Sequence, residues 1–245
     1  NNVLAGLVSY PELLLLQMTQ EDSHRKYVET IKKSGEKAAA IVHDLLSLAR
    51  RSISISDIIN LNHVIREFLE SPEYKKILSY HPNVAIKSQL DPRLPNLSGS
   101  PVHLSKALMN IISNAAEAMP AQGEITVLTY STMLDLPPEG YEEVAPGEYV
   151  VLEVADTGIG IAPEDIDHIF EPFFTKKKLG RSGTGLGMAV VWGTVEDHNG
   201  YITVKSTQGK GTRFFLYFPA THEKLSAQAD HLFAIADIKG QGQSI

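Results

Sequence analysis

The sequence predicts an α+β protein: a hairpin of two long helices, followed by an α/β sandwich whose helices cover one face of a mixed sheet. Apolar residues recur at helical spacing between residues 3 and 48, interrupted by a short polar turn. From residue 60 to residue 220, segments in which apolar and polar residues alternate, as in strands, are interspersed with helical segments and glycine-rich bends. We therefore assign 1–52 to the hairpin, 53–221 to the sandwich and 222–245 to a linker-like tail.

Composition narrows the class of protein. The chain has 245 residues, enough for one large domain and a smaller element, and its net charge of −7 argues against a nucleic-acid binder. It has no cysteine, which excludes disulfides and thiolate metal sites, and its nine histidines show no metal-binding spacing. Apolar runs such as Leu13–Leu16 are far shorter than a membrane span. We expect this fragment to lie in the cytoplasm without membrane contact.

Two helices are predicted before residue 52. The first, at 1–18, carries an apolar stripe and contains Pro11, where we expect a kink. After a polar turn at 19–22, the second helix begins near Ser23, a candidate cap, and extends to Arg51. Two helices joined by a short turn cannot bury their apolar stripes alone. We therefore predict a homodimer in which four helices form a bundle.

The elements of the sandwich follow from local periodicity and from breaks at proline, glycine and asparagine. Predicted helices, the first of them capped by Asn60 or Asn62, span 61–69, 74–78, 100–119, 163–170 and 188–198. Predicted strands span 84–88, 125–129, 149–155, 201–206 and 212–218. Residues 52–57 are predicted as linker or a short strand, and 91–95 and 133–147 as surface loops.

The strand at 149–155 leads into the most informative stretch of the chain. It stops at Asp156, and Gly158 and Gly160 follow, so a carboxylate enters a bend where backbone N–H groups can approach a ligand closely. Further on, GTGLGM at 183–188 opens a helix, whose first N–H groups and dipole favour an anion such as phosphate. A carboxylate for a base edge and a cradle for phosphates together predict a nucleotide site.

Three common nucleotide motifs are absent from the sequence. The Gly-Lys pair at 209–210 is followed by Gly211, which does not make a Walker A loop. The third glycine of a Rossmann fingerprint is replaced by Met188 after one glycine run and by Pro163 after the other. The HRD and DFG motifs of protein kinases do not occur.

The predicted helix at 100–119 supplies a further part of the site. One of its faces is apolar, and Asn110 and Asn114 are four residues apart, hence neighbours on the helix surface. Asparagine is a mediocre helix former, and its side-chain oxygen suits Mg²⁺. The pair is therefore a candidate for a magnesium–phosphate group.

Four blocks in order, NIISNAAEAM, DTGIGI, IFEPFFTKK and GTGLGM, resemble the catalytic domain of two-component sensor histidine kinases, in the GHKL ATPase superfamily. The resemblance implies ATP and Mg²⁺ as cofactors, with Asn114 holding Mg²⁺ and Asn110 assisting. It implies that Asp156 accepts a hydrogen bond from the adenine amino group. Further implied contacts are Gly158, Gly160 and Thr212 at the base, and Gly183, Thr184, Gly185, Leu186 and Gly187 at the phosphates.

The block IFEPFFTKK leads into a polar and basic run at 175–182, which we expect to be the mobile lid over ATP. Lys176 and Arg181 in this run are the cations expected to act in catalysis, because positive charge stabilises a transferring phosphoryl group.

The resemblance extends to the hairpin, which in this family dimerises and carries the phosphoacceptor His in a run of the type His-Asp-hydrophobic-Asn-Asn. The chain begins Asn1-Asn2, so we expect the acceptor just before residue 1. His43-Asp44 lies on the second helix, where the family has no acceptor, and we interpret it as a helix-surface or bundle pair. The tail ends Ser-Ile, similar to the lead-in to a receiver domain, so the expected partner is a response-regulator receiver, separate or C-terminal.

The sequence thus predicts a protein-histidine kinase that transfers the γ-phosphoryl group of ATP. ATP-hydrolysing relatives in the superfamily carry a Glu where this chain has Asn110. An amide cannot accept a proton at neutral pH, so we expect slow hydrolysis. Two alternatives stay open: a non-catalytic dimeric ATP-binding scaffold, and a serine kinase of the anti-sigma type.

Overall fold

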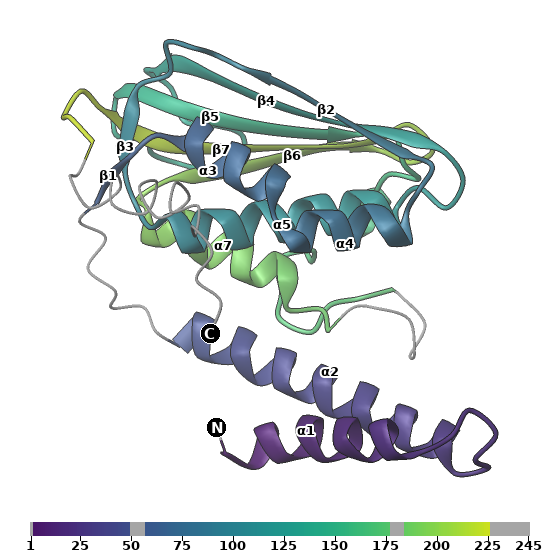
Figure 1. Ribbon diagram of the computed structural model, residues 1–245. Coiled ribbons are helices and arrows are strands. Elements are labelled where there is room, and N and C mark those ends of the chain that lie inside the picture. The colour runs from purple at the N-terminus through teal and green to yellow at the C-terminus, as the bar shows by residue number, and fades with distance from the viewer. Residues whose placement is uncertain (1, 50–56, 177–183, 226–245) are drawn as a thin grey trace.

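The computed structural model describes residues 2–49, 57–176 and 184–225, which form a helical hairpin and a helix-covered sheet (Figure 1). The helices are α1 (Asn2–Gln17), α2 (Arg25–Ala49), α3 (Leu61–Glu70), α4 (Pro72–Tyr80), α5 (Pro101–Glu117), α6 (Pro163–Ile166) and α7 (Gly187–Asp197). The strands are β1 (Ile58–Ile59), β2 (Val84–Leu90), β3 (Asn96–Ser98), β4 (Gly123–Leu134), β5 (Gly147–Asp156), β6 (Tyr201–Thr207) and β7 (Gly211–Thr221).

The strands form one mixed sheet in the order β1-β3-β7-β5-β4-β2, with β6 also paired to β7. Strand β2 runs parallel to β4, and the other pairs are antiparallel. Strands β4, β5 and β7 are long and lie side by side. Since β5 sits between β4 and β7, the carboxylate at its end is held by neighbours on both sides. The predicted mixed sheet is confirmed.

Helices α3, α4, α5 and α7 lie against one face of the sheet (Figure 1). The apolar face predicted for 100–119 packs inward, and both Ile111 and Ile112 are fully buried. They share the core with Leu152 of β5 and with Leu216 of β7. Burying this surface is the main source of stability here. It also aligns α5 with α7, whose facing sides carry the candidate site.

The hairpin of α1 and α2 lies on the far side of α7 from the sheet, and α2 approaches α7 (Figure 1). Helix α1 continues through Pro11, which has no N–H for the carbonyl of Leu7. Gly35 of α2 lies against that carbonyl; a Cβ there would be 2.7 Å from the Leu7 oxygen. Arg25 closes the turn, because its Nη1 donates to the carbonyls of Leu15 at 3.2 Å and Met18 at 3.1 Å.

Several predicted boundaries move in the structure. The loop predicted at 133–147 is shorter, since β4 extends to Leu134, which pairs with Gly147. The helix predicted at 163–170 shrinks to α6, and the following turns let Phe170 pack on Trp192 with ring centroids 5.1 Å apart. Strands β1 and β3 were not predicted, because each is too short to show a period. Of the predicted linker or short strand at 52–57, residues 52–56 lie outside the described residues, as do residues 226–245 of the tail.

Candidate functional site

The side chain of Asp156 lies at the end of β5, where the sheet meets a glycine-rich bend. It is 9% exposed, and the N–H of Gly158 donates to its Oδ1 at 2.7 Å. Burial raises the pKa of Asp156, and backbone hydrogen bonds from Gly158 and Thr212 oppose that rise. A carboxylate fixed in this way has a defined direction and a spare lone pair for a ligand.

The bend after Asp156 is tied to the turn between β6 and β7. The N–H of Ile161 donates to Ser206 Oγ at 2.8 Å, and Ser206 Oγ lies 2.9 Å from Thr212 Oγ1. Thr212 is 5% exposed and so belongs to the floor of the site. The structure therefore brings Asp156 and Thr212 together, with Ser206 as a supporting residue that sequence reasoning missed. The register of β6 on β7, with Ser206 opposite Thr212, is the signal that could have found it.

Asn110 lies on the face of α5 that meets the start of α7. A Cβ built on Gly187 would sit 3.3 Å from Asn110 Oδ1, so the two helices nearly touch at this point. Among the residues that the structure describes, Asn110 Nδ2 is the one buried side-chain nitrogen or oxygen without a hydrogen-bond partner. An unsatisfied buried donor costs about 1–3 kcal/mol and calls for an explanation. Asn114 lies one turn further along and is half-buried.

The start of α7 is open to an anion. Leu186 is its N-cap residue, and no side chain caps the first N–H groups. Leu186 is fully buried, its N–H donates to Thr184 Oγ1 at 3.2 Å, and Gly185 before it has a φ of 70°. The uncapped N–H groups and the positive end of the helix dipole favour a phosphate here. Of the predicted phosphate contacts, Gly183 lies outside the described residues.

Two contacts hold the start of the predicted lid and the residues just before it. The N–H of Phe173 donates to the carbonyl of Gly185 at 2.9 Å, and Phe173 has a φ of 70°, unusual for a residue with a side chain. Lys176 Nζ lies 2.6 Å from Asp165 Oδ2, and this bond raises the pKa of Lys176. Arg181 lies outside the described residues.

Taken together, these groups offer a buried and oriented carboxylate on β5 and unpaired N–H groups suited to an anion at the start of α7. The described residues contain no group of three His, Cys, Asp or Glu side chains that could hold a metal. A magnesium ion would therefore have to use amide oxygens, water and a ligand's own phosphates, as Mg²⁺ commonly does. A separate shallow groove of about 360 Å³ lies along α7 and is lined by Phe170, Trp192 and Glu196, among others; it shares no residue with this site.

Residues 99–222 match the family of histidine kinase-, DNA gyrase B-, and HSP90-like ATPases. The chain belongs to this family. The match spans half of the chain and contains every site residue named above, so this ATPase domain is the part of the protein that holds the candidate site. No described helix of the domain or of the hairpin is long and apolar enough to cross a membrane.

Curated relatives that match most of the chain include sensor histidine kinases, so the resemblance inferred from the sequence is confirmed. The sensor kinase CckA of Brucella abortus is 31% identical over 230 residues, 93% of this chain and 24% of that protein. The sensory histidine kinase/phosphatase NtrB of Rhodobacter capsulatus is 28% identical over 244 residues, 91% of this chain and 60% of that protein. The chain thus spans less than two thirds of these relatives.

Solved structures agree on the fold. Full-length ShkA in complex with AMPPNP superposes with a TM-score of 0.68 at 24% identity, covering 92% of this chain and 44% of that one. A catalytic domain of the histidine kinase ThkA superposes with a TM-score of 0.52 at 25% identity, covering 67% of this chain and 95% of that one. The sheet with its helices is therefore the fold of histidine kinase catalytic domains.

Proposed function

We propose that this chain is the ATP-binding and phosphotransfer core of a sensor histidine kinase. It binds Mg-ATP and transfers the γ-phosphoryl group to a His of the dimerisation helix, for relay to an Asp of a receiver domain. The observation that carries the proposal is the unpartnered Asn110 Nδ2 beside the uncapped start of α7. A phosphate oxygen is the acceptor that this donor and these N–H groups lack.

The base end of the site selects adenine. Asp156 accepts a hydrogen bond from the exocyclic amino group, and its bond to the Gly158 N–H holds the carboxylate in place. Gly160 has a φ of 67°, and a Cβ there would run into the backbone of Thr207. Only glycine therefore allows the bend after Asp156 to pack this closely against Thr207. Guanine presents a carbonyl where adenine presents its amino group, and a carboxylate repels it.

The phosphate end combines backbone and side-chain donors. The segment from Gly183 through Thr184, Gly185 and Leu186 to Gly187 wraps the phosphates, and Asn110 Nδ2 donates to one of their oxygens. Asn114 offers its side-chain oxygen to Mg²⁺, and Asn110 can offer a second oxygen when its amide turns over. When bound, Mg²⁺ supplies positive charge against the phosphate oxygens.

The amide of Asn110 also decides what happens to the phosphoryl group. An amide cannot accept a proton, so no general base at this position activates water. Hydrolysis is slow, and the phosphoryl group is kept for an imidazole acceptor. The hairpin serves this transfer by pairing with a second copy, which presents acceptor helices to the two ATP sites of the dimer.

The first test is binding. Isothermal titration calorimetry with Mg-ATP should show affinity for the wild type that Asp156→Asn lowers about 10- to 100-fold, since a hydrogen bond to a charged group is lost. Asp135→Asn, at an exposed position outside the site, is the matched control and should bind as the wild type does. Equal affinity of Asp156→Asn and wild type would contradict the proposal.

The second test is transfer. With γ-labelled ATP and a separately supplied acceptor helix of the same hairpin, the helix should gain acid-labile, base-stable phosphate. ATP binding without any transfer would favour a nucleotide-dependent scaffold instead. Acid-stable label on a partner would favour a serine kinase.

A further inference from the structure

Lys176 is the described cation nearest in sequence to the phosphate cradle that follows, and the structure shows it bound to a carboxylate. Its Nζ lies 2.6 Å from Oδ2 of Asp165, a residue of α6. The side chain of Asp165 is 13% exposed and that of Lys176 is 65% exposed. The carboxylate is therefore held in the protein surface, whereas the ammonium reaches it from solvent.

The backbone places Lys176 within reach of the phosphate cradle as well. Phe173 N–H is bonded to the carbonyl of Gly185 at 2.9 Å, two residues before α7 begins. The three residues from Phe173 to Lys176 span at most about 10 Å. A lysine this close to Phe173 can reach either Asp165 or an anion at the start of α7. Its single ammonium cannot form a close ion pair with both at the same time.

The residues around Asp165 are acidic and therefore favour a bound cation. Glu164 precedes it, and Asp167 follows two residues later, so this short stretch carries three carboxylates. Both neighbours are exposed, and no ion pair of the described residues joins either of them to a lysine or an arginine. Of these three carboxylates, Asp165 is the one whose oxygen lies in ion-pair contact with Lys176.

We propose that Asp165 competes with the nucleotide phosphates for Lys176. Without nucleotide, Lys176 is held on α6; with ATP, the ammonium leaves Asp165 and moves to the phosphates. The ion pair must break before Lys176 can contribute to phosphate binding, so Asp165 lowers the affinity for ATP. Asp165 also determines how much negative charge the phosphates need in order to draw Lys176 away from it. This inference rests on the proposed function, because it requires a phosphate-bearing ligand in the site.

The test is a double-mutant cycle read by calorimetry. Asp165→Asn should tighten Mg-ATP binding about two- to fivefold, the range expected for a partly exposed ion pair. Asp167→Asn removes the same charge two residues away and should leave ATP affinity unchanged. Lys176→Met should weaken ATP binding, and Asp165→Asn should have no effect in the Lys176→Met background. Adenosine, which has no phosphate, should bind equally to wild type and Asp165→Asn.

Several results would overturn the inference. Weaker ATP binding by Asp165→Asn would mean that Asp165 anchors Lys176 in its working position. Tighter binding that persists with Lys176→Met, or that Asp167→Asn reproduces, would mean a general effect of negative charge.

If the wild type binds neither Mg-ATP nor adenosine, the proposed function fails and this inference with it. If the wild type binds both and Asp165→Asn is unchanged, only this inference fails. Equal thermal unfolding of all variants without nucleotide checks that each is folded.

Discussion

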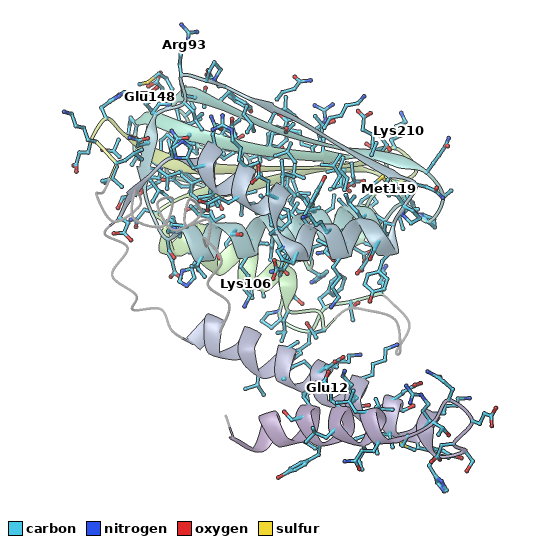
Figure 2. All side chains as sticks on the ribbon, viewed as in Figure 1. Glu12, Arg93, Lys106, Met119, Glu148 and Lys210 are labelled. Carbon is cyan, nitrogen blue, oxygen red and sulfur yellow. The ribbon has the colours of Figure 1, made fainter. Side chains whose placement is uncertain are left out.

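Asn62, which is buried, and Asn110, whose Nδ2 atom is buried, show how differently the same residue type is used. Asn62, at the start of α3, is satisfied: its Nδ2 donates to Asp91 O at 2.7 Å, and its Oδ1 accepts from Thr129 Oγ1 at 2.7 Å. Asn110 on α5 leaves its Nδ2 without a partner. The first residue stabilises the fold, whereas the second costs stability, which agrees with the ligand contact proposed for it. Figure 2 shows the described side chains on the ribbon, with many of them between the sheet and the helices that cover it.

This contrast predicts opposite effects for two matched substitutions. Asn110→Leu should raise the free energy of unfolding without nucleotide by about 1 kcal/mol, because it removes an unsatisfied polar group, and should weaken Mg-ATP binding about tenfold. Asn62→Leu should lower the free energy of unfolding by about 2–3 kcal/mol and leave the affinity of the folded protein for ATP unchanged. Urea unfolding and calorimetry measure the two quantities. Destabilisation by Asn110→Leu would contradict this view of the site.

His198 joins the two helices that carry the site. Its Nδ1 lies 2.6 Å from the carbonyl of Thr194, and its Nε2 accepts from the N–H of Ser100, the N-cap residue of α5, at 3.0 Å. Both bonds together require the neutral ring with its proton on Nδ1. A Cβ on Gly99 would lie 2.7 Å from the ring, so glycine permits this close approach. Burial lowers the pKa of His198 from its ordinary 6.5.

Stability should therefore depend on pH through His198. Below about pH 6.5 the unfolded chain takes up a proton at this residue, whereas the folded protein resists it until a lower pH. The free energy of unfolding should fall as pH drops through that window, and the fall should end below the folded pKa. His198→Asn should flatten this part of the profile, as measured by urea unfolding between pH 8 and pH 5 in steps of about half a unit. Parallel profiles for wild type and variant would rule out a role for His198 in the pH dependence.

At the scale of elements, the turn between β6 and β7 shapes the end of the candidate site that contains Asp156. Gly211 has a φ of 106°, and a Cβ there would run into the backbone oxygen of Asp156. Thr212 and Ser206 flank this contact and are paired across the hairpin. The turn is thus pressed against the strand that delivers the carboxylate, which explains why a glycine is needed there.

Three glycine-to-alanine variants distinguish the cost of an unfavourable backbone φ from the cost of a steric clash at the added Cβ. Gly147→Ala should change the free energy of unfolding by less than about 0.5 kcal/mol, because nothing lies within 4 Å of its Cβ and its backbone is not left-handed. Gly140→Ala should cost about 1–2 kcal/mol, since its φ of 90° is unfavourable although its surroundings are open. Gly211→Ala should cost more than about 3 kcal/mol, because both penalties apply. Equal losses for Gly140 and Gly211 variants in urea unfolding would show that Asp156 is not in close contact.

For the whole molecule, the distribution of apolar surface sets the hairpin apart from the sandwich. Exposed large apolar side chains gather on α1 and α2: Leu7, Tyr10, Leu13, Leu14, Leu16, Tyr27 and Ile31. A patch of this kind on a two-helix element marks an interface, because the hairpin has too little neighbouring surface to cover it. This supports the proposed dimer, in which a second hairpin covers the patch.

Charged substitutions in this patch should separate the protomers. Leu13→Glu combined with Leu16→Glu should convert a dimer to a monomer, because each side chain is more than half exposed in the single chain and would be buried against the second hairpin. Met133→Glu, at an apolar position that is 63% exposed on the sheet, is the matched control and should stay dimeric. Size-exclusion chromatography with light scattering measures the mass. A monomeric wild type would contradict the proposed bundle.

Sequence periodicity located most elements because their signals are local. The helix at 100–119 shows its buried face at three- and four-residue spacing, and α5 follows it closely. The strand ending at Asp156 was equally clear, since alternation stops where the glycines begin. Boundaries failed where a distant partner decides them: Leu134 stays in β4 because Gly147 pairs with it.

The sequence by itself determined the family, the order of the parts and the residue types available to a nucleotide, because motif spacing and apolar periodicity are properties of the chain. Only the tertiary structure decided which of those residues are already engaged. Asn110 is left without a partner, Lys176 is bound to Asp165, and Ser206 joins Thr212 across a hairpin. Each of these outcomes depends on side chains from separate elements meeting at hydrogen-bond distance, a relation set by packing that local spacing does not contain.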